Sequence, residues 1–129
     1  MGKEYEEIDF LIIEDDLDTN TFLNEFFKTQ GYNCRSARNI KDALELLKNN
    51  IPSIILLDIL LPDKKGYEII TFIKSNPLLN NVLIYFLTAV PIHDAIRKVE
   101  EYNIEGAIGK PFNLEELKLL FKDLRKKRR

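Results

Sequence analysis

Residues 8–13 read IDFLII, and three acids, EDD, follow this apolar run without a break. Such a run is typical of a parallel β-strand that other elements cover on both faces. Similar runs occupy residues 53–58 and 82–87, and weaker strand patterns occupy residues 32–37 and 105–109. The sequence therefore predicts five short strands.

Segments with helical spacing separate these strands. The first carries Phe22, Leu23, Phe26 and Phe27, which we expect on one buried face, and it ends at Gly31. The later helical patterns include, in chain order, Ala43 and Leu47, Ile69 and Ile73, Ala95 and Val99, and Leu117 and Leu120. Strict alternation of strand and helix predicts an α/β fold, a parallel sheet with helices on both faces, because right-handed crossovers leave few other arrangements.

The composition is that of one ordinary globular domain. A chain of 129 residues, 45% hydrophobic and 31% charged, can bury a core without disulfides. A net charge of −2 argues against a dedicated nucleic-acid binder. The lone cysteine, Cys34, favours a reducing compartment, and no apolar run approaches the roughly 20 residues of a membrane span. We therefore expect a cytoplasmic protein with no membrane contact.

A basic tail, RKKRR at residues 125–129, is the one shift in composition. We interpret it as a solvated helix end, which the partial negative charge at a helix C-terminus favours. Contact with nucleic acid, or the start of a linker to an output domain, are the alternatives.

Polar side chains follow the predicted strands where a parallel sheet gathers its strand ends. Glu14 and Asp15 follow the first strand, Asp58 ends the third, Thr88 follows the fourth, and Lys110 follows the fifth. Ligands of open parallel sheets bind at this edge. Crowded carboxylates need a cation, and oxygen ligands favour a hard divalent ion such as Mg²⁺ or Mn²⁺. Thr88 and Lys110 would then be available to hold a phosphoryl group.

The motifs IIEDD, LLDILLPDKKGYE, FLTA and GKPF, in this order, resemble the receiver domain of two-component response regulators. The resemblance runs from residue 8 to about residue 124. It implies a flavodoxin-like, doubly wound sheet of five parallel strands in the order 2-1-3-4-5. It also implies that residues 1–129 form a single receiver domain, with a core of 8–124 and the tail 125–129.

The resemblance assigns a metal site to the acids. Asp15 would bind Mg²⁺ directly, Glu14 would act through water, and Asp58 and the backbone carbonyl of Leu60 would complete the protein ligands.

The resemblance also assigns the phosphoryl chemistry. Asp58 would accept a phosphoryl group from the phosphohistidine of a sensor histidine kinase or a phosphotransfer protein. Thr88 would move toward that group and Lys110 would pair with one of its oxygens. The bond from Lys110 to Pro111 is expected to be cis, a form that essentially only a bond before proline adopts.

The signal would then pass to a downstream protein or output domain. It would travel through the fourth helix, fifth strand and fifth helix, a face that a homodimer could also use. By this reading the domain is not an enzyme.

Three features of the sequence depart from the family's pattern. Ala107 stands where many receivers carry a tyrosine or phenylalanine whose rotamer reports phosphorylation. Lys64 and Lys65 make the loop after the third strand basic, which could assist encounter with an acidic or phosphorylated partner. Leu60 and Val90, the flanks of the phosphoryl pocket, are both apolar, and we predict slow self-dephosphorylation.

Two other functions stay open. A degenerate receiver could act only as a binding module, and it would then fail to take up phosphate. A small Mg²⁺-dependent phosphohydrolase could also use a strand-end aspartate. However, its D-x-D-x-[TV] pattern fits poorly here, since Asp16 and Asp18 are followed by Asn20. We expect Asp18 to cap the first helix. Asp16 could be a second capping residue or could support the metal site without binding the metal.

Overall fold

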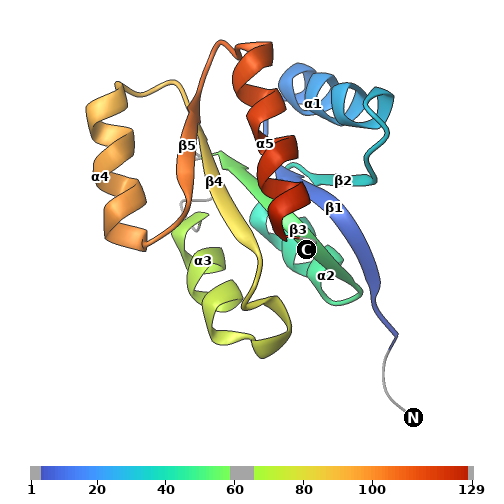
Figure 1. Cartoon of the computed structure of the whole chain (residues 1–129). Coiled ribbons are helices and arrows are strands. Elements are labelled where there is room, and N and C mark those ends of the chain that lie inside the picture. Colours follow the sequence, from blue (N-terminus) through green and yellow to red (C-terminus); the bar gives the residue numbers. More distant parts are fainter. Residues whose placement is uncertain (1–3, 59–65, 128–129) are drawn as a thin grey trace.

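Five parallel strands form one sheet in the computed structural model, which describes residues 4–58 and 66–127 (Figure 1). The strands are β1 (Glu6–Ile13), β2 (Cys34–Ala37), β3 (Asn50–Asp58), β4 (Leu83–Thr88) and β5 (Gly106–Gly109). Their order is β2-β1-β3-β4-β5, and every neighbouring pair is parallel. The predicted fold class and strand order are confirmed.

Helices cover both faces of this sheet (Figure 1). They are α1 (Leu17–Thr29), α2 (Ile40–Leu47), α3 (Gly66–Ser75), the short 3₁₀ helix η1 (Pro77–Leu79), α4 (Ile92–Tyr102) and α5 (Leu114–Lys127). Apolar side chains of α1 and α5 pack on one face of the sheet, and those of α2, α3 and α4 pack on the other. Each face therefore has its own hydrophobic core, and the central strands are buried between the two cores, as their apolar runs predict. Within the described residues, every helix is too short or too polar to cross a membrane.

The third strand begins earlier than its apolar run indicates, at Asn50 rather than at Ser53. Residues 50–52 continue the parallel pairing with β1, and the side-chain amide of Asn50 donates to the carbonyl of Leu46 at 2.8 Å. This contact attaches the start of β3 to the end of α2. Asparagine and proline at the strand start are typical of a turn, so the sequence pattern understates the strand.

Two expectations for α1 are wrong. Asp16, not Asp18, caps the helix: its Oδ2 accepts from the Thr19 backbone N–H at 2.9 Å and from the Thr19 hydroxyl at 2.6 Å. Asp18 lies in the first turn, where its charge still suits the helix dipole.

Phe22 is 44% exposed rather than part of the core, and its ring stacks on Phe112 with centroids 6.4 Å apart. The buried face of α1 is instead formed by Asn20, Leu23 and Phe27.

Candidate functional site

Three carboxylates meet at the carboxyl edge of the sheet. Glu14 and Asp15 follow the end of β1, and Asp58 is the last residue of β3. One carboxylate oxygen from each of the three lies within 4.8 Å of the others. Glu14 and Asp58 are buried and Asp15 is half-buried. Parallel pairing of β1 with β3 brings these acids together although more than 40 residues separate them in the chain.

Lys110 extends its ammonium group toward these acids. It forms an ion pair with the buried carboxylate of Glu14, and its Nζ lies 3.6 Å from Asp58 Oδ2. The backbone N–H of Lys110 donates to the carbonyl of Thr88 at 2.7 Å, which joins the ends of β4 and β5. The bond from Lys110 to Pro111 is cis, as predicted. One ammonium group thus faces two buried carboxylates at the sheet edge.

Burial and the neighbouring carboxylate disfavour the ionised form of Glu14. Burial raises the pKa of the Glu14 carboxyl to about 7, the neighbouring Asp58 carboxylate adds to the rise, and Lys110 opposes it. Burial also acts to lower the pKa of Lys110, but the carboxylates of Glu14 and Asp58 outweigh it and the pKa is raised. A further cation beside Glu14 and Asp58 would favour their ionised forms.

Thr88 occupies the end of β4 and is only 2% exposed. Its hydroxyl oxygen accepts a hydrogen bond from the backbone N–H of Val90 at 2.9 Å. Val90 itself is half-buried. The threonine hydroxyl therefore contacts the first residues of the segment that leads into α4. Leu60, Lys64 and Lys65, which also have predicted roles, lie outside the described residues.

Two residues that sequence reasoning missed fix the backbone of the acids. The side-chain amide of Asn20 is buried and donates to the carbonyls of Glu14 and Ala37, at 3.0 and 3.1 Å. The guanidinium group of Arg38 donates twice to the carbonyl of Asp15, at 3.1 and 3.0 Å. Asn20 has a signal in the sequence, because an amide there interrupts the apolar stripe of α1.

The three carboxylates are suited to a hard divalent cation. Their oxygens lie close enough to share one ion, and the group contains no sulfur or imidazole ligand. Oxygen ligands of this kind select Mg²⁺, Mn²⁺ or Ca²⁺ over softer metals. The acidic cluster can therefore hold a metal.

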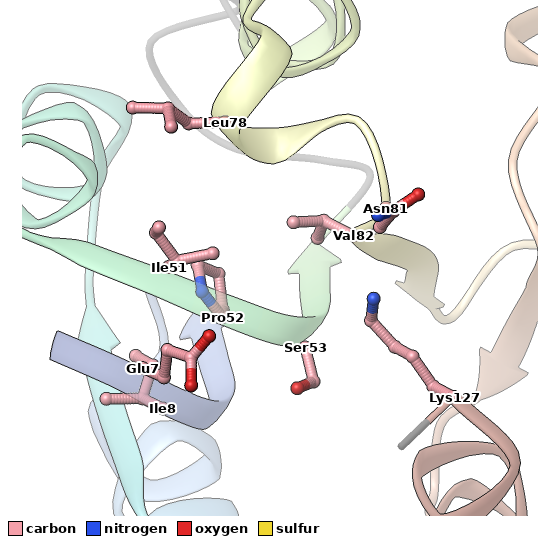
Figure 2. A pocket seen from close by; sticks show the side chains of 9 residues that line it. All are labelled: Glu7, Ile8, Ile51, Pro52, Ser53, Leu78, Asn81, Val82 and Lys127. Atoms are coloured by element: carbon pink, nitrogen blue, oxygen red, sulfur yellow. The ribbon is translucent and has the colours of Figure 1, made fainter. Parts of the chain in front are cut away.

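A separate pocket of about 360 Å³ opens at the opposite edge of the sheet (Figure 2). It lies between the first residues of β1 and β3, with Glu7 and Ser53 on the strands, Leu78 on η1, and Lys127 extending from α5. Its walls are mixed in polarity. None of the predicted site residues lines it, and ligands of open parallel sheets bind at the carboxyl edge instead.

Comparison with known proteins identifies the class of this protein. Residues 10–122 match the response regulator receiver domain family. The chain therefore belongs to that family, whose members are signalling domains of two-component systems and act with histidine kinases or phosphotransfer proteins and with output domains.

Three individual proteins illustrate the range of relatives. Sporulation initiation phosphotransferase F of Bacillus subtilis is 30% identical over 108 residues, which cover 84% of this chain and 86% of the relative. Histidine kinase P4 of Formosa agariphila is 32% identical over 123 residues, 94% of this chain, but the chain spans only 9% of that kinase. The receiver domain of a DNA-binding response regulator from Colwellia psychrerythraea superposes with a TM-score of 0.82 at 28% identity, over 92% of this chain and 98% of that one.

Proposed function

We propose that Asp58 accepts a phosphoryl group from a phosphohistidine of a sensor histidine kinase or phosphotransfer protein, in a reaction that requires Mg²⁺ or Mn²⁺. The observation that carries the proposal is the position of Asp58. Its carboxylate is buried at the sheet edge, within 4.8 Å of oxygens of Glu14 and Asp15, and 3.6 Å from the ammonium of Lys110. Membership of the receiver family supports the same reaction.

The chemistry asks little covalent help from the protein. An oxygen of Asp58 forms a bond to phosphorus as the bond from phosphorus to the histidine nitrogen breaks, and the electron pair of that bond returns to the imidazole. The rate then depends on in-line positioning and on neutralising charge on the phosphoryl oxygens. Lys110 would hold one of these oxygens as a cation, and the Thr88 hydroxyl would donate to another.

A divalent cation would supply the remaining positive charge at this site. In the proposal Asp15 and Asp58 bind it directly, Glu14 holds it through water, and the backbone carbonyl of Leu60 is a further ligand. Three carboxylates meet here and only the ammonium of Lys110 pairs with Glu14 and Asp58 among the described residues, which supports this arrangement.

The proposal treats residues 1–129 as one receiver domain, with a core of 8–124 and a basic tail of 125–129. The domain acts in the cytoplasm, takes and loses its own phosphoryl group, and turns over no other substrate. Its signal passes to a downstream protein or output domain through the face formed by α4, β5 and α5. Two copies of the chain can use the same face to form a dimer.

In this proposal the apolar residues two positions after Asp58 and Thr88 in the sequence also make the aspartyl phosphate long-lived. Val90 offers no group that could activate or orient a hydrolytic water, and Leu60 is equally apolar. We expect a phosphoryl lifetime of minutes or longer, and a lifetime of seconds would contradict this part of the proposal.

Intact-protein mass spectrometry after incubation with acetyl phosphate and Mg²⁺ tests the reaction. We expect a gain of one phosphoryl group in the wild type and in Asp94→Asn, an exposed control aspartate on α4. Asp58→Asn, and the wild type with a chelator, should show no gain. Absence of any gain in the wild type would favour a degenerate binding module, and steady hydrolysis of phosphate esters would favour the phosphohydrolase.

A further inference from the structure

Ala107 lies at the centre of β5, directly beside Phe86 of β4 in the sheet. Both side chains belong to the core beneath α2, α3 and α4, and Ala107 is half-buried there. A methyl group at this position fills far less volume than the aromatic side chain that many receivers carry. An aromatic link between the site and α4 therefore has to come from an element other than β5.

Two tyrosines from neighbouring helices gather around Phe86. The rings of Tyr67 on α3 and Tyr102 on α4 stack with centroids 4.5 Å apart and planes inclined by only 1°. Both rings stand edge-on to Phe86, at 6.1 Å with 88° and at 6.3 Å with 87°. Offset or perpendicular aromatic pairs of this kind attract through their quadrupoles as well as through burial. Tyr67, Phe86 and Tyr102, here called the aromatic cluster, thus join α3, β4 and α4.

Two polar contacts reinforce the connection between α3 and α4. The ammonium of Lys98 on α4 lies 5.2 Å from the centre of the Tyr67 ring, within the range of a cation–π interaction. Near the C-terminal ends of the two helices, Lys74 of α3 donates a hydrogen bond to the carbonyl of Asn103, which caps α4. These two contacts join α3 to α4 in addition to the stacked rings.

The described side chains of α4 are mostly exposed or half-buried. Pro91 precedes its first turn and provides no side-chain cap. Among the described side chains of α4, Ala95 alone is buried, and Ile96 is 46% exposed. Elements with few buried contacts open and shift most easily. The rings and methyl groups of Tyr102, Val99 and Ala95 are therefore among the apolar contacts that hold α4 on the sheet.

The aromatic cluster is connected along the chain to the proposed phosphoryl site. Phe86 is two residues before Thr88 on β4, and Tyr67 follows the segment that leaves Asp58. The Thr88 hydroxyl accepts from the backbone of Val90, at the entrance to α4. A movement of Thr88 toward a phosphoryl group therefore disturbs both the strand beneath the cluster and the segment that leads into α4.

We propose that the aromatic cluster of Tyr67, Phe86 and Tyr102 transmits the phosphorylation state of Asp58 to α4, with Tyr102 replacing the aromatic side chain absent at position 107. This inference rests on the proposed function of Asp58. The signal reaches α4 through Tyr102 on that helix and through Tyr67 on α3, rather than through a rotating side chain on β5.

Amide chemical shifts of the isotope-labelled full chain, measured before and after phosphorylation with acetyl phosphate and Mg²⁺, test the inference. In Tyr102→Ala the shift changes of α4 amides should fall about twofold or more relative to the wild type, while those near Thr88 stay similar. Tyr102→Phe keeps the ring and should behave as the wild type. Tyr102→Leu, which keeps apolar contact without stacking, replaces the alanine variant if that variant fails to fold.

A rescue experiment makes the test more specific. In the double variant Tyr102→Ala with Ala107→Tyr, the ring is returned to β5, and we expect the α4 shift changes to recover. Full α4 shift changes in a folded, phosphorylated Tyr102→Ala or Tyr102→Leu would overturn the inference and leave the proposed function intact. Absence of phosphoryl gain by mass in the wild type would instead overturn the proposed function, and the inference with it.

Discussion

Replacing Asn20 with alanine should destabilise the fold by about 2–3 kcal/mol, more than its single amide group would indicate. Asn20 is 5% exposed, and its side-chain amide donates to two backbone carbonyls, those of Glu14 and Ala37. These carbonyls belong to the ends of β1 and β2, so the side chain joins α1 to both strands beside the acidic cluster.

The magnitude follows from what each carbonyl loses. Each hydrogen bond contributes about 1 kcal/mol net, and a buried carbonyl left without a donor costs a further 1 kcal/mol or more. The carbonyl of Ala37 still accepts from the backbone N–H of Glu14 at 3.0 Å. Most of the cost of an unsatisfied carbonyl therefore falls on Glu14. Alanine returns about 0.5 kcal/mol through its better helix propensity.

Asn24, one turn further along α1, provides a matched control. Its Oδ1 is buried and has no hydrogen-bond partner among the described residues. Asn24→Ala gains the same helix propensity and removes a poorly satisfied amide, so its free energy of unfolding should be unchanged or slightly higher. The difference between the two variants isolates the hydrogen bonds of Asn20.

Urea unfolding of the two variants and the wild type, followed by circular dichroism, measures these free energies. Equal free energies of unfolding for Asn20→Ala and Asn24→Ala, within about 0.5 kcal/mol, would refute the reasoning. Isothermal titration with Mg²⁺ adds a second measurement. We expect weaker binding in Asn20→Ala alone, because the backbone of Glu14 is then less firmly held.

Three further predictions concern the two cores. Phe27→Ala should lower the free energy of unfolding by about 3–5 kcal/mol, since the ring of Phe27 is fully buried. Phe22→Ala should lower it clearly less, because Phe22 is half-exposed. Cys34 should resist iodoacetamide at pH 8 in the folded chain, because burial raises the pKa of its thiol to about 12. Burial, followed by the hydrogen bond to Asp123, raises the pKa of Tyr85. Stability should therefore fall as pH rises above about 10, and fall less in Tyr85→Phe.

Each of these predictions has a measurement that can contradict it. Similar urea midpoints for Phe27→Ala and Phe22→Ala would contradict the first prediction, because they would mean that the two rings contribute equally to the core. Rapid alkylation of Cys34 in the folded chain would show that the thiol is accessible and would contradict the second prediction. For Tyr85, the sign follows because the unfolded side chain loses its proton first, so alkali favours unfolding. Parallel stability curves of wild type and Tyr85→Phe above pH 10 would contradict this account.

The parts of the site that the sequence predicted are those that topology alone brings together. Each of these residues lies at the end of a strand or just after it, and parallel strands end at one edge of a sheet. They are Glu14, Asp15, Asp58, Thr88 and Lys110. Their meeting therefore needs no knowledge of side-chain packing. The strand order came from the family resemblance, because alternation of strands and helices allows several orders.

The parts that were missed depend on contacts between distant segments. Asn20 donates to Ala37, a partner that no local pattern in α1 indicates. Asp16 and Asp18 are equally good capping residues, and only the first residue of the helix, Leu17, decides between them. Phe22 has the spacing of a core residue, but its ring lies beyond the edge of the buried stripe and meets Phe112 instead.

The position of Lys110 has a consequence for how the protein is made. Glu14 and Asp58 leave the ribosome well before Lys110, which follows the fifth and outermost strand. A nascent chain that has paired β1 with β3 already holds two carboxylates together, but it lacks the ammonium that accompanies them in the finished fold. Such a chain carries an electrostatically incomplete site until translation passes β5. In the proposed reaction, which uses the Lys110 ammonium, Asp58 would accept a phosphoryl group only after β5 has joined the sheet.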